Sequence, residues 1–174
     1  IEIALTRSCN YACHFCYAMT HENDRSVISK ENIFNFLDDA AEIGVEGISL
    51  VSDGESTVSP VFVETIERGG KNGLSMATAT NGFLLNQDKL ERILPNLTYI
   101  RFNISAGEPA RYAKIMGCKE KWFHKVVENI KSAVKIKNEN KLKVTIGMQM
   151  VFMPQYYDQL VPLAKLGKEL RPDY

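Results

Sequence analysis

Short apolar runs alternate with amphipathic stretches along the whole chain, and no other feature limits the possible folds as strongly. The runs that have the length and composition of strands are residues 1–6, 47–52, 74–80, 99–105 and 144–152. Between them, apolar residues recur at intervals of three and four, which is typical of helices. Strands that are separated by helices form a parallel sheet with right-handed crossovers. The sequence therefore predicts an α/β fold with about five βα units.

The choice within this class lies between an open doubly wound sheet and a curved barrel. A closed eight-stranded barrel typically needs about 250 residues, whereas the chain has 174. Only a partial barrel is therefore expected. In both architectures, functional residues lie in the loops after the carboxyl ends of the strands. The cysteines and the polar residues that could take part in binding or catalysis do lie in these loops.

Local signals place several helix ends. Ser29 is expected to cap a helix that ends at Gly44, and the pair Ser59–Pro60 is expected to open the next one. A short helix is expected to begin near Asn86 and to stop at Pro95.

The charge balance and the hydropathy exclude some classes of partner. The 21 basic and 21 acidic residues cancel, which argues against a nucleic acid held by charge alone. No apolar run reaches the roughly 18 to 20 residues that span a membrane, and no signal segment opens the chain. We therefore expect a cytoplasmic location without a membrane partner. Because Ile1 already stands in a strand-like pattern, the chain is expected to be a piece of a longer protein.

Three cysteines follow the first predicted strand, at Cys9, Cys13 and Cys16. In a reducing setting, clustered thiols bind metal or react more often than they form disulfides. Zinc sites usually present two Cys-x2-Cys pairs, and no second pair exists here. A zinc site would need a distant ligand such as His14, His21 or Cys118. Three thiolates instead suit a cubane iron-sulfur cluster with one iron left open.

The spacing Cys-x3-Cys-x-aromatic-Cys resembles the cluster loop of radical S-adenosylmethionine (SAM) enzymes. The resemblance implies that Cys9, Cys13 and Cys16 hold a 4Fe-4S cluster whose open iron binds the amino and carboxylate groups of SAM. Reductive cleavage of SAM would then yield a 5'-deoxyadenosyl radical that abstracts hydrogen from a substrate. The family fold is a partial (βα)6 barrel. Residues 1–174 would form a core domain that is incomplete at both ends, with a C-terminal auxiliary region beyond it.

The segment after the second predicted strand, residues 53–56, resembles the Gly-Gly-Glu-Pro segment of the family. The resemblance implies that Gly54 and Glu55 contact the amino group of SAM. Asp53 and Ser56 depart from the usual form of the segment. After the third predicted strand, residues 80–82 resemble a Thr-Asn-Gly turn of the family, for which we expect a structural role.

Further SAM contacts are implied near the ends of the later strands. Asn103 and Ser105 stand where relatives contact the SAM ribose or carboxylate, and Val151 stands where relatives pack against the adenine. Phe15, between two of the cysteines, is expected to shield the cluster or to pack near the adenine. Many relatives carry an arginine where this chain has Met116. Arg111 is the replacement that this stretch of sequence offers for a carboxylate contact.

The resemblance leaves the substrate and its catalytic residues unassigned. The substrate classes considered are a peptide side chain, a sugar or other small metabolite, and a partner enzyme that is activated as a glycyl radical. An external reductant such as flavodoxin or ferredoxin is expected. The alternative is a non-enzymatic electron-transfer or sensing module, in which Cys118 closes the cluster as a fourth ligand.

Overall fold

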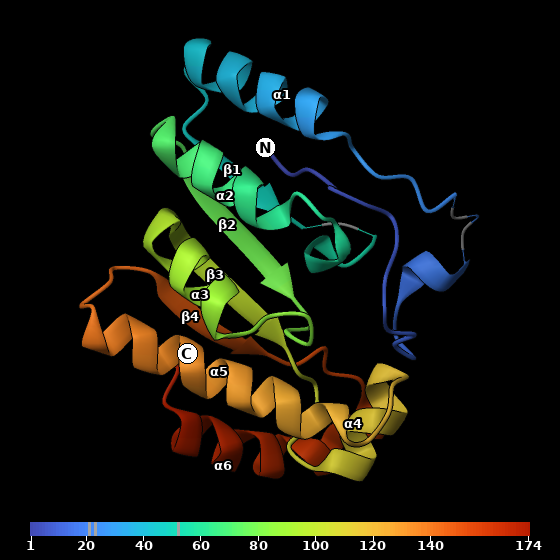
Figure 1. Cartoon of the computed structure of the whole chain (residues 1–174). Helices are drawn as coiled ribbons and strands as arrows, with labels where there is room; N and C mark the ends of the chain where they lie inside the picture. The colour runs from blue at the N-terminus through green and yellow to red at the C-terminus, as the bar shows by residue number, and fades with distance from the viewer. Residues whose placement is uncertain (21, 23, 52) are drawn as a thin grey trace.

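The computed structural model describes residues 1–20, 22, 24–51 and 53–174 (Figure 1). Within these residues, one sheet contains β1 (Gly47–Leu50), β2 (Ser75–Thr80), β3 (Leu97–Asn103) and β4 (Thr145–Gln149). All neighbouring strands are parallel, and they lie in their order along the chain. Each connection therefore crosses back over the sheet through helical structure. The predicted α/β class is confirmed.

The first predicted strand, residues 1–6, pairs with β1 only at its beginning. The Ile3 amide donates a hydrogen bond of 3.0 Å to the Ser49 carbonyl, and the Ser49 amide donates one of 2.8 Å back to the first residue. Further along, Thr6 forms an antiparallel bridge with Val27. The prediction of a six-residue strand is therefore too long, because the chain leaves β1 on its way to the cysteine loop.

Residues 171–174 reach the opposite edge of the sheet. The Asp173 amide donates to the Ile146 carbonyl at 2.8 Å, and the Met148 amide donates to the Tyr174 carbonyl at 2.9 Å. The sheet thus gains a short paired segment beside β4, as it does beside β1.

Six α-helices accompany the strands in the described part of the chain. They are α1 (Lys30–Glu42), α2 (Phe62–Lys71), α3 (Gln87–Ile93), α4 (Pro109–Met116), α5 (Trp122–Glu139) and α6 (Leu160–Leu170). Short 3-10 helices are η1 (Tyr17–Thr20), η2 (Ser56–Val58), η3 (Leu94–Asn96) and η4 (Pro154–Gln159). No helix among the described residues is both long and apolar enough to cross a bilayer.

The predicted starts of α1 and α2 can be compared with the structure. The Ser29 hydroxyl accepts a hydrogen bond of 3.2 Å from the Asn32 amide and caps α1, as predicted. The start of α2 differs from its prediction, because its N-cap is Val61 and not Ser59. Ser59 instead ends η2, with its amide donating to the Ser56 carbonyl. The turn that follows β1 therefore delays the helix.

Strand residues alternate between a helix-covered face and an open face. Ile48, Met76 and Phe102 are buried on the side where Figure 1 shows α2, α3 and α5 lying across the sheet. A Cβ added at Gly69 of α2 would lie only 2.2 Å from the Met76 sulfur, so this helix packs closely on β2. On the opposite side, which we call the inner face, side chains are small or polar and partly exposed. Its members include Ser49, Ala77, Ala79, Tyr99, Arg101, Asn103 and Gln149.

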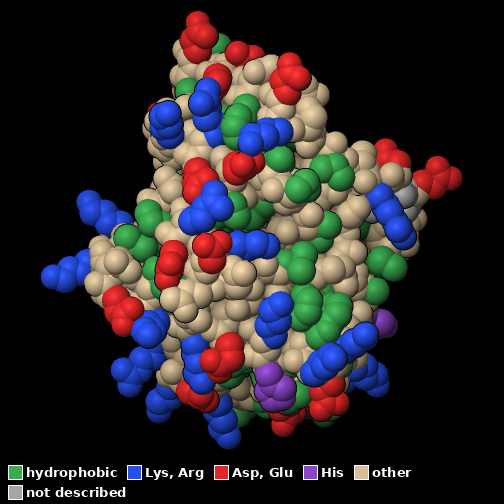
Figure 2. Space-filling view, in the orientation of Figure 1, with side chains coloured by type: hydrophobic (Ala, Val, Ile, Leu, Met, Phe, Trp, Pro, Cys, Tyr) green, Lys and Arg blue, Asp and Glu red, His purple; other side chains and the backbone are tan. Residues whose placement is uncertain are grey.

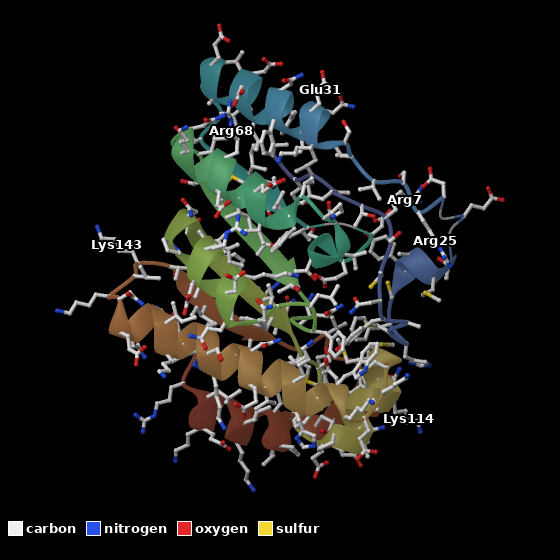
Figure 3. All side chains as sticks on the ribbon, viewed as in Figure 1. Arg7, Arg25, Glu31, Arg68, Lys114 and Lys143 are labelled. Carbon is white, nitrogen blue, oxygen red and sulfur yellow. The ribbon has the colours of Figure 1, made fainter. Side chains whose placement is uncertain are left out.

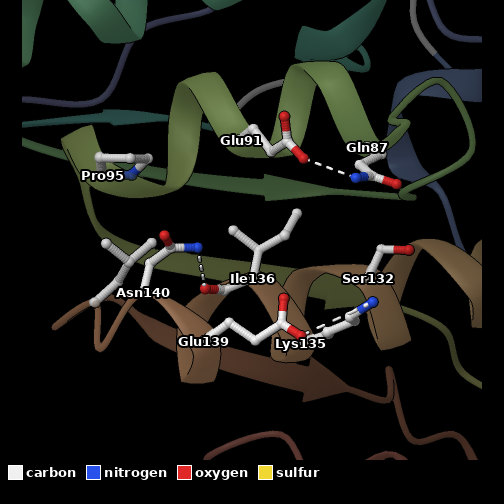
Figure 4. A pocket seen from close by; sticks show the side chains of 9 residues that line it. Gln87, Glu91, Pro95, Ser132, Lys135, Ile136, Glu139 and Asn140 are labelled. Carbon is white, nitrogen blue, oxygen red and sulfur yellow. Dashed lines mark hydrogen bonds and ion pairs between the residues drawn. The ribbon is translucent and has the colours of Figure 1, made fainter.

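Charges of both signs share the face of the helices that Figure 2 presents, among the residues that the structure describes. A groove of about 420 Å³ lies between α3 and α5 (Figure 4). Polar side chains along it bond one another, as Gln87 does with Glu91 at 2.7 Å and Lys135 with Glu139 at 3.9 Å. We assign no function to this seam between two helices.

Candidate functional site

The cysteine loop borders a cavity at the carboxyl ends of the strands. Cys9, Cys13 and Cys16 all line this cavity, which has a volume of about 450 Å³. Arg7 and Arg25, labelled in Figure 3, line it as well. The predicted three-thiol cluster of residues is thus a single site in space.

Backbone contacts hold this loop from two sides. The His14 amide donates to the Ile115 carbonyl at 2.9 Å, which ties the loop to α4. Gly117 ends α4 with a φ of 59°, and a Cβ there would lie 1.9 Å from the Ala12 carbonyl oxygen. On the other side, a Cβ at Gly54 would lie 2.3 Å from the Thr6 carbonyl oxygen. Glycine is therefore required at both positions for the backbones to approach each other.

An aromatic layer lies under the loop. Tyr11 is buried, and its hydroxyl pairs with the Tyr112 hydroxyl at 2.9 Å. The Tyr11 ring contacts the rings of Phe83 and Trp122, with centroids 6.3 and 5.4 Å away. Phe15 is half-buried and packs against the core rather than lining the cavity described above. These rings exclude water from the inner side of the cysteine loop.

The three loop thiols are close enough to influence one another. Burial, followed by the negative charges of Cys9 and Cys16, raises the pKa of Cys13 to about 12. Burial also raises the pKa of Cys9, with smaller contributions from Glu55 and Cys16. The thiolate forms therefore require a positive partner, which iron would supply. The donor set fits a cationic iron-sulfur centre.

A zinc site receives no support from the same residues. Within the described part of the chain, no three Cys, His, Asp or Glu side chains converge as a single metal ion requires. A cubane has a different requirement, because each thiolate binds a separate iron. His14 Nδ1 instead lies 2.6 Å from the Tyr156 hydroxyl. His21, another ligand considered for zinc, lies outside the described residues.

Cys118 follows the end of α4 and is half-buried. Burial raises the pKa of its thiol to about 11, although a hydrogen bond with the Tyr11 hydroxyl lowers it in part. The described residues that line the cavity of the three loop cysteines do not include Cys118. Cys118 is near enough to Cys13 for its negative charge to contribute to the raised pKa of that thiol. Only its absence from the described lining of the cavity sets it apart from the three loop cysteines.

Glu55 is a buried carboxylate that joins the ends of two strands. Its Oε1 accepts hydrogen bonds from the Thr57 amide at 3.1 Å, the Thr57 hydroxyl at 2.7 Å and the Thr80 hydroxyl at 2.7 Å. Its Oε2 accepts one from the Asn81 amide at 2.7 Å. The side chain is only 4% exposed, and all of these donors are neutral. A buried negative charge without a cation is costly, so the site fits a positively charged ligand group at Oε2.

The Thr-Asn-Gly turn extends this network to the cysteine loop. The Phe83 amide donates to Asn81 Oδ1 at 3.0 Å, and Asn81 Nδ2 donates to Asn10 Oδ1 at 2.8 Å. The turn also needs glycine at Gly82, whose φ is 75°. Its residues therefore position Glu55 and the loop, which is more than the turn-forming role that the sequence predicts. Asn10 was not predicted, since nothing in its local pattern marks a contact with residue 81.

The ends of β3 and β4 place the other predicted SAM contacts. Asn103 Oδ1 is buried and has no hydrogen-bond partner. Ser105 is fully buried with a φ of 30°, and its hydroxyl accepts a hydrogen bond of 3.1 Å from the Val151 amide. Val151 itself is half-buried. Asn103 thus has an acceptor available for a ligand, whereas Ser105 connects the two strand ends.

Other residues near the site are already committed to protein contacts. Arg111 donates to both carboxylate oxygens of Asp158 at 2.6 Å, which leaves it poorly placed as a replacement for the arginine of relatives. Asp53, which departs from the usual glycine, accepts a hydrogen bond of 2.7 Å from the Tyr17 hydroxyl. This contact ties η1 to the loop after β1.

Comparison with known proteins places this site in a family. The family model described as the Radical SAM superfamily matches residues 3–166. A "Probable GTP 3',8-cyclase" of Saccharolobus solfataricus is 34% identical over 140 residues, covering 78% of this chain and 44% of that protein. The "Tungsten-containing aldehyde ferredoxin oxidoreductase cofactor-modifying protein" of Pyrococcus furiosus is 26% identical over 168 residues, covering 95% and 47%. The chain spans about half the length of these curated relatives.

Solved structures show the same fold. Streptococcus suis SuiB bound to S-adenosylmethionine matches 98% of this chain and 38% of its own with a TM-score of 0.77, at 17% identity. Native anSMEcpe with bound AdoMet matches 99% of this chain and 50% of its own with a TM-score of 0.77, at 16% identity. This likeness confirms the predicted partial barrel.

Proposed function

Because this chain belongs to the radical SAM superfamily, whose enzymes use a 4Fe-4S cluster and SAM, we propose that it forms the SAM-binding core of such an enzyme. The observation that supports this most directly is the single cavity lined by Cys9, Cys13 and Cys16. When bound, the cluster supplies an electron and SAM supplies the carbon radical that removes hydrogen from a substrate.

The cysteine loop has the task of holding the cluster with one iron open. Its three thiols face one cavity, and Gly54 and Gly117 let the neighbouring backbones approach the loop. The aromatic layer that contains Tyr11 keeps water from the inner side of the loop. A loop clamped in this way keeps its thiols in place when no cluster is bound, which lowers the entropic cost of binding one.

Six further residues are proposed to surround SAM and the cluster. Glu55 binds the ammonium group through Oε2, because its charge is buried among neutral donors only. Asn103 offers its unpaired Oδ1 to the ribose. Ser105 holds the Val151 amide and so positions Val151 against the adenine. Gly54 brings its own backbone to the cysteine loop, where the methionine part of SAM would lie. Phe15 packs behind the cluster.

The substrate and the electron donor are proposed only by class. The relatives named above include a probable GTP cyclase and a cofactor-modifying protein, and SuiB is known bound to its precursor peptide SuiA. A small metabolite or a peptide is therefore proposed as the substrate. We propose a reductant such as flavodoxin or ferredoxin, and a cytoplasmic location in which such a donor is present.

Electron paramagnetic resonance tests this function. The protein is reconstituted with iron and sulfide under anaerobic conditions, reduced with dithionite, and measured with and without SAM. We expect the cluster signal to change when SAM is added and 5'-deoxyadenosine to form. A cluster signal that is indifferent to SAM, at SAM concentrations up to the millimolar range, would contradict the proposal. The variant Cys13→Ser is the control, since it should give neither the signal nor the product.

A further inference from the structure

The inner face of the sheet contains a layer of long polar side chains between small ones. Arg101 lies in the middle of β3, with Ala79 of β2 and Gly147 of β4 as its cross-strand partners. Because neither neighbour has a large side chain, the space on both sides of Arg101 is left open by the sheet itself. Gln149 lies two residues beyond Gly147, at the diagonal position that long side chains can reach.

The polar atoms of this layer lack partners. Arg101 Nε and Gln149 Oε1 are buried and form no hydrogen bond. No described carboxylate forms an ion pair with Arg101, whereas Arg68, Arg92 and Arg111 each have one. A buried guanidinium nitrogen without a partner is costly. The Arg101 guanidinium therefore lacks a negatively charged partner among the described residues, while the Gln149 oxygen lacks a hydrogen-bond donor.

A tyrosine borders the position beside Arg101. A Cβ at Gly147 would lie 2.3 Å from Tyr174 Cζ, so the Tyr174 ring occupies the place above that glycine. The ring stacks on Tyr99, and the two hydroxyls are 2.5 Å apart. Burial and this hydrogen bond raise the pKa of Tyr174 to about 12, while the charge of Arg101 opposes the increase. The phenol therefore stays neutral beside the guanidinium and does not neutralise it.

We infer that Arg101 binds an anionic group of the substrate, a carboxylate or a phosphate, on the inner face of the partial barrel, with the Gln149 side chain donating through Nε2 as a second contact. This inference rests on the proposed function, because it places the substrate next to the edge where SAM would lie. Arginine suits the task, since its planar fork matches both kinds of oxyanion. Ala79 leaves room for such a group on one side of Arg101, whereas the Tyr174 ring covers Gly147 on the other side.

Thermal unfolding of the cluster-loaded protein in the presence of two probe anions tests the inference. Inorganic tripolyphosphate represents a phosphorylated substrate and citrate a carboxylated one, each titrated at constant ionic strength. We expect at least one probe to raise the unfolding midpoint in a saturable way. In Arg101→Gln the half-saturating concentration should rise at least tenfold, and in Arg101→Lys it should rise less. A response to only one probe identifies which oxyanion the substrate carries.

The matched control is Arg92→Gln, which removes an arginine that is ion-paired with Glu67 at 2.7 Å on the helical surface. It should respond to the probes as the parent does. The inference is overturned if neither probe acts on the parent, or if Arg101→Gln responds as the parent does. A purely structural role of Arg101 would also overturn the inference. In that case Arg101→Gln lowers the unfolding midpoint without any probe, and Arg101→Lys restores that midpoint but shows no response to either anion. The titration needs neither SAM nor turnover, so a failed SAM response leaves its result standing.

Discussion

The Thr80 hydroxyl donates a hydrogen bond of 2.7 Å to Glu55 Oε1 and so joins the end of β2 to the end of β1. The two residues are 25 positions apart in the sequence. Together with Thr57 and the Asn81 amide, Thr80 holds a buried carboxylate at one position and in one orientation. A carboxylate that is held in this way before a ligand arrives loses little entropy when it binds one.

Replacing this carboxylate should weaken SAM binding. Glu55→Gln keeps the size of the side chain but removes its charge, so the ammonium group of SAM loses a charged hydrogen bond. We expect the free energy of SAM binding to fall by about 1 to 3 kcal/mol. Equilibrium binding of SAM to the cluster-loaded variant measures this loss. An unchanged dissociation constant in a folded variant would remove Glu55 from the SAM site.

The two kinds of cysteine should respond differently to alanine. Cys13→Ala removes a thiol that lines the cavity, so the iron content after reconstitution should fall to a small fraction of that of the parent. Cys118→Ala removes a thiol that lies beside Tyr11 instead, so the iron and sulfide content should stay at the parent level. Elemental analysis checks both variants. A cluster lost from Cys118→Ala would instead support the closed electron-transfer site.

Replacing Asn103 should mainly affect SAM affinity, whereas replacing Ser105 should mainly affect the free energy of unfolding. Asn103→Ala removes an acceptor that bonds nothing in the protein, so SAM affinity should fall by about 1 kcal/mol while the free energy of unfolding changes little. Ser105→Ala breaks its hydrogen bond with the Val151 amide, so the free energy of unfolding should fall by about 1 to 3 kcal/mol. Chemical denaturation and SAM titration of both variants measure the two quantities. Equal effects on both quantities in both variants would contradict this division.

Replacing Gly54 should show how much the close backbone approach beside the cysteine loop contributes to the free energy of unfolding. In Gly54→Ala, the added Cβ would meet the carbonyl oxygens of Thr6 and Ser8 at 2.3 and 2.7 Å. Because both atoms belong to the backbone, the free energy of unfolding should fall by about 1 to 3 kcal/mol or more. Gly167→Ala in α6 is the control. Its Cβ meets nothing within 4 Å, so this variant should gain about 0.5 to 1 kcal/mol from helix propensity.

The ion pair between Arg111 and Asp158 should make the stability of the fold depend on pH below about pH 4. Hydrogen bonds from Arg111, followed by Gln159, lower the pKa of Asp158 from 3.8 to about 2. A lowered pKa in the folded state stabilises the protein above pH 3.8, and this contribution is lost as the pH falls toward 2. Carboxyl resonances in a nuclear magnetic resonance titration should show this low pKa in the parent. In Arg111→Gln the pKa should return toward 3.8; a pKa that stays near 2 would assign the effect to other donors.

Several features could be predicted because they depend on neighbours along the chain. The alternation of apolar runs and helical stretches predicts the parallel sheet, since periodicity reports burial directly. The start of α1 follows from Ser29, whose hydroxyl reaches an amide three residues away. The prediction for the start of α2 was wrong because it considered only the local pair Ser59–Pro60. Glu55 caps the short helix η2 through the Thr57 amide, and Ser59 ends η2, so Ser59 is not available as the N-cap of α2.

The sequence by itself determined the α/β class, the three-thiol loop and the family to which that loop belongs. Each of these follows from the spacing of apolar residues or of cysteines along the chain. Only the tertiary structure decided which polar atoms are satisfied and which remain open. Asn103 and Arg101 both stand in an apolar strand, and nothing in their local pattern separates them from Ser105. The parallel register brings Ser105 to the Val151 amide and leaves Arg101 between Ala79 and Gly147. Whether a buried polar atom finds a partner depends on residues tens of positions away, which only the folded chain brings together.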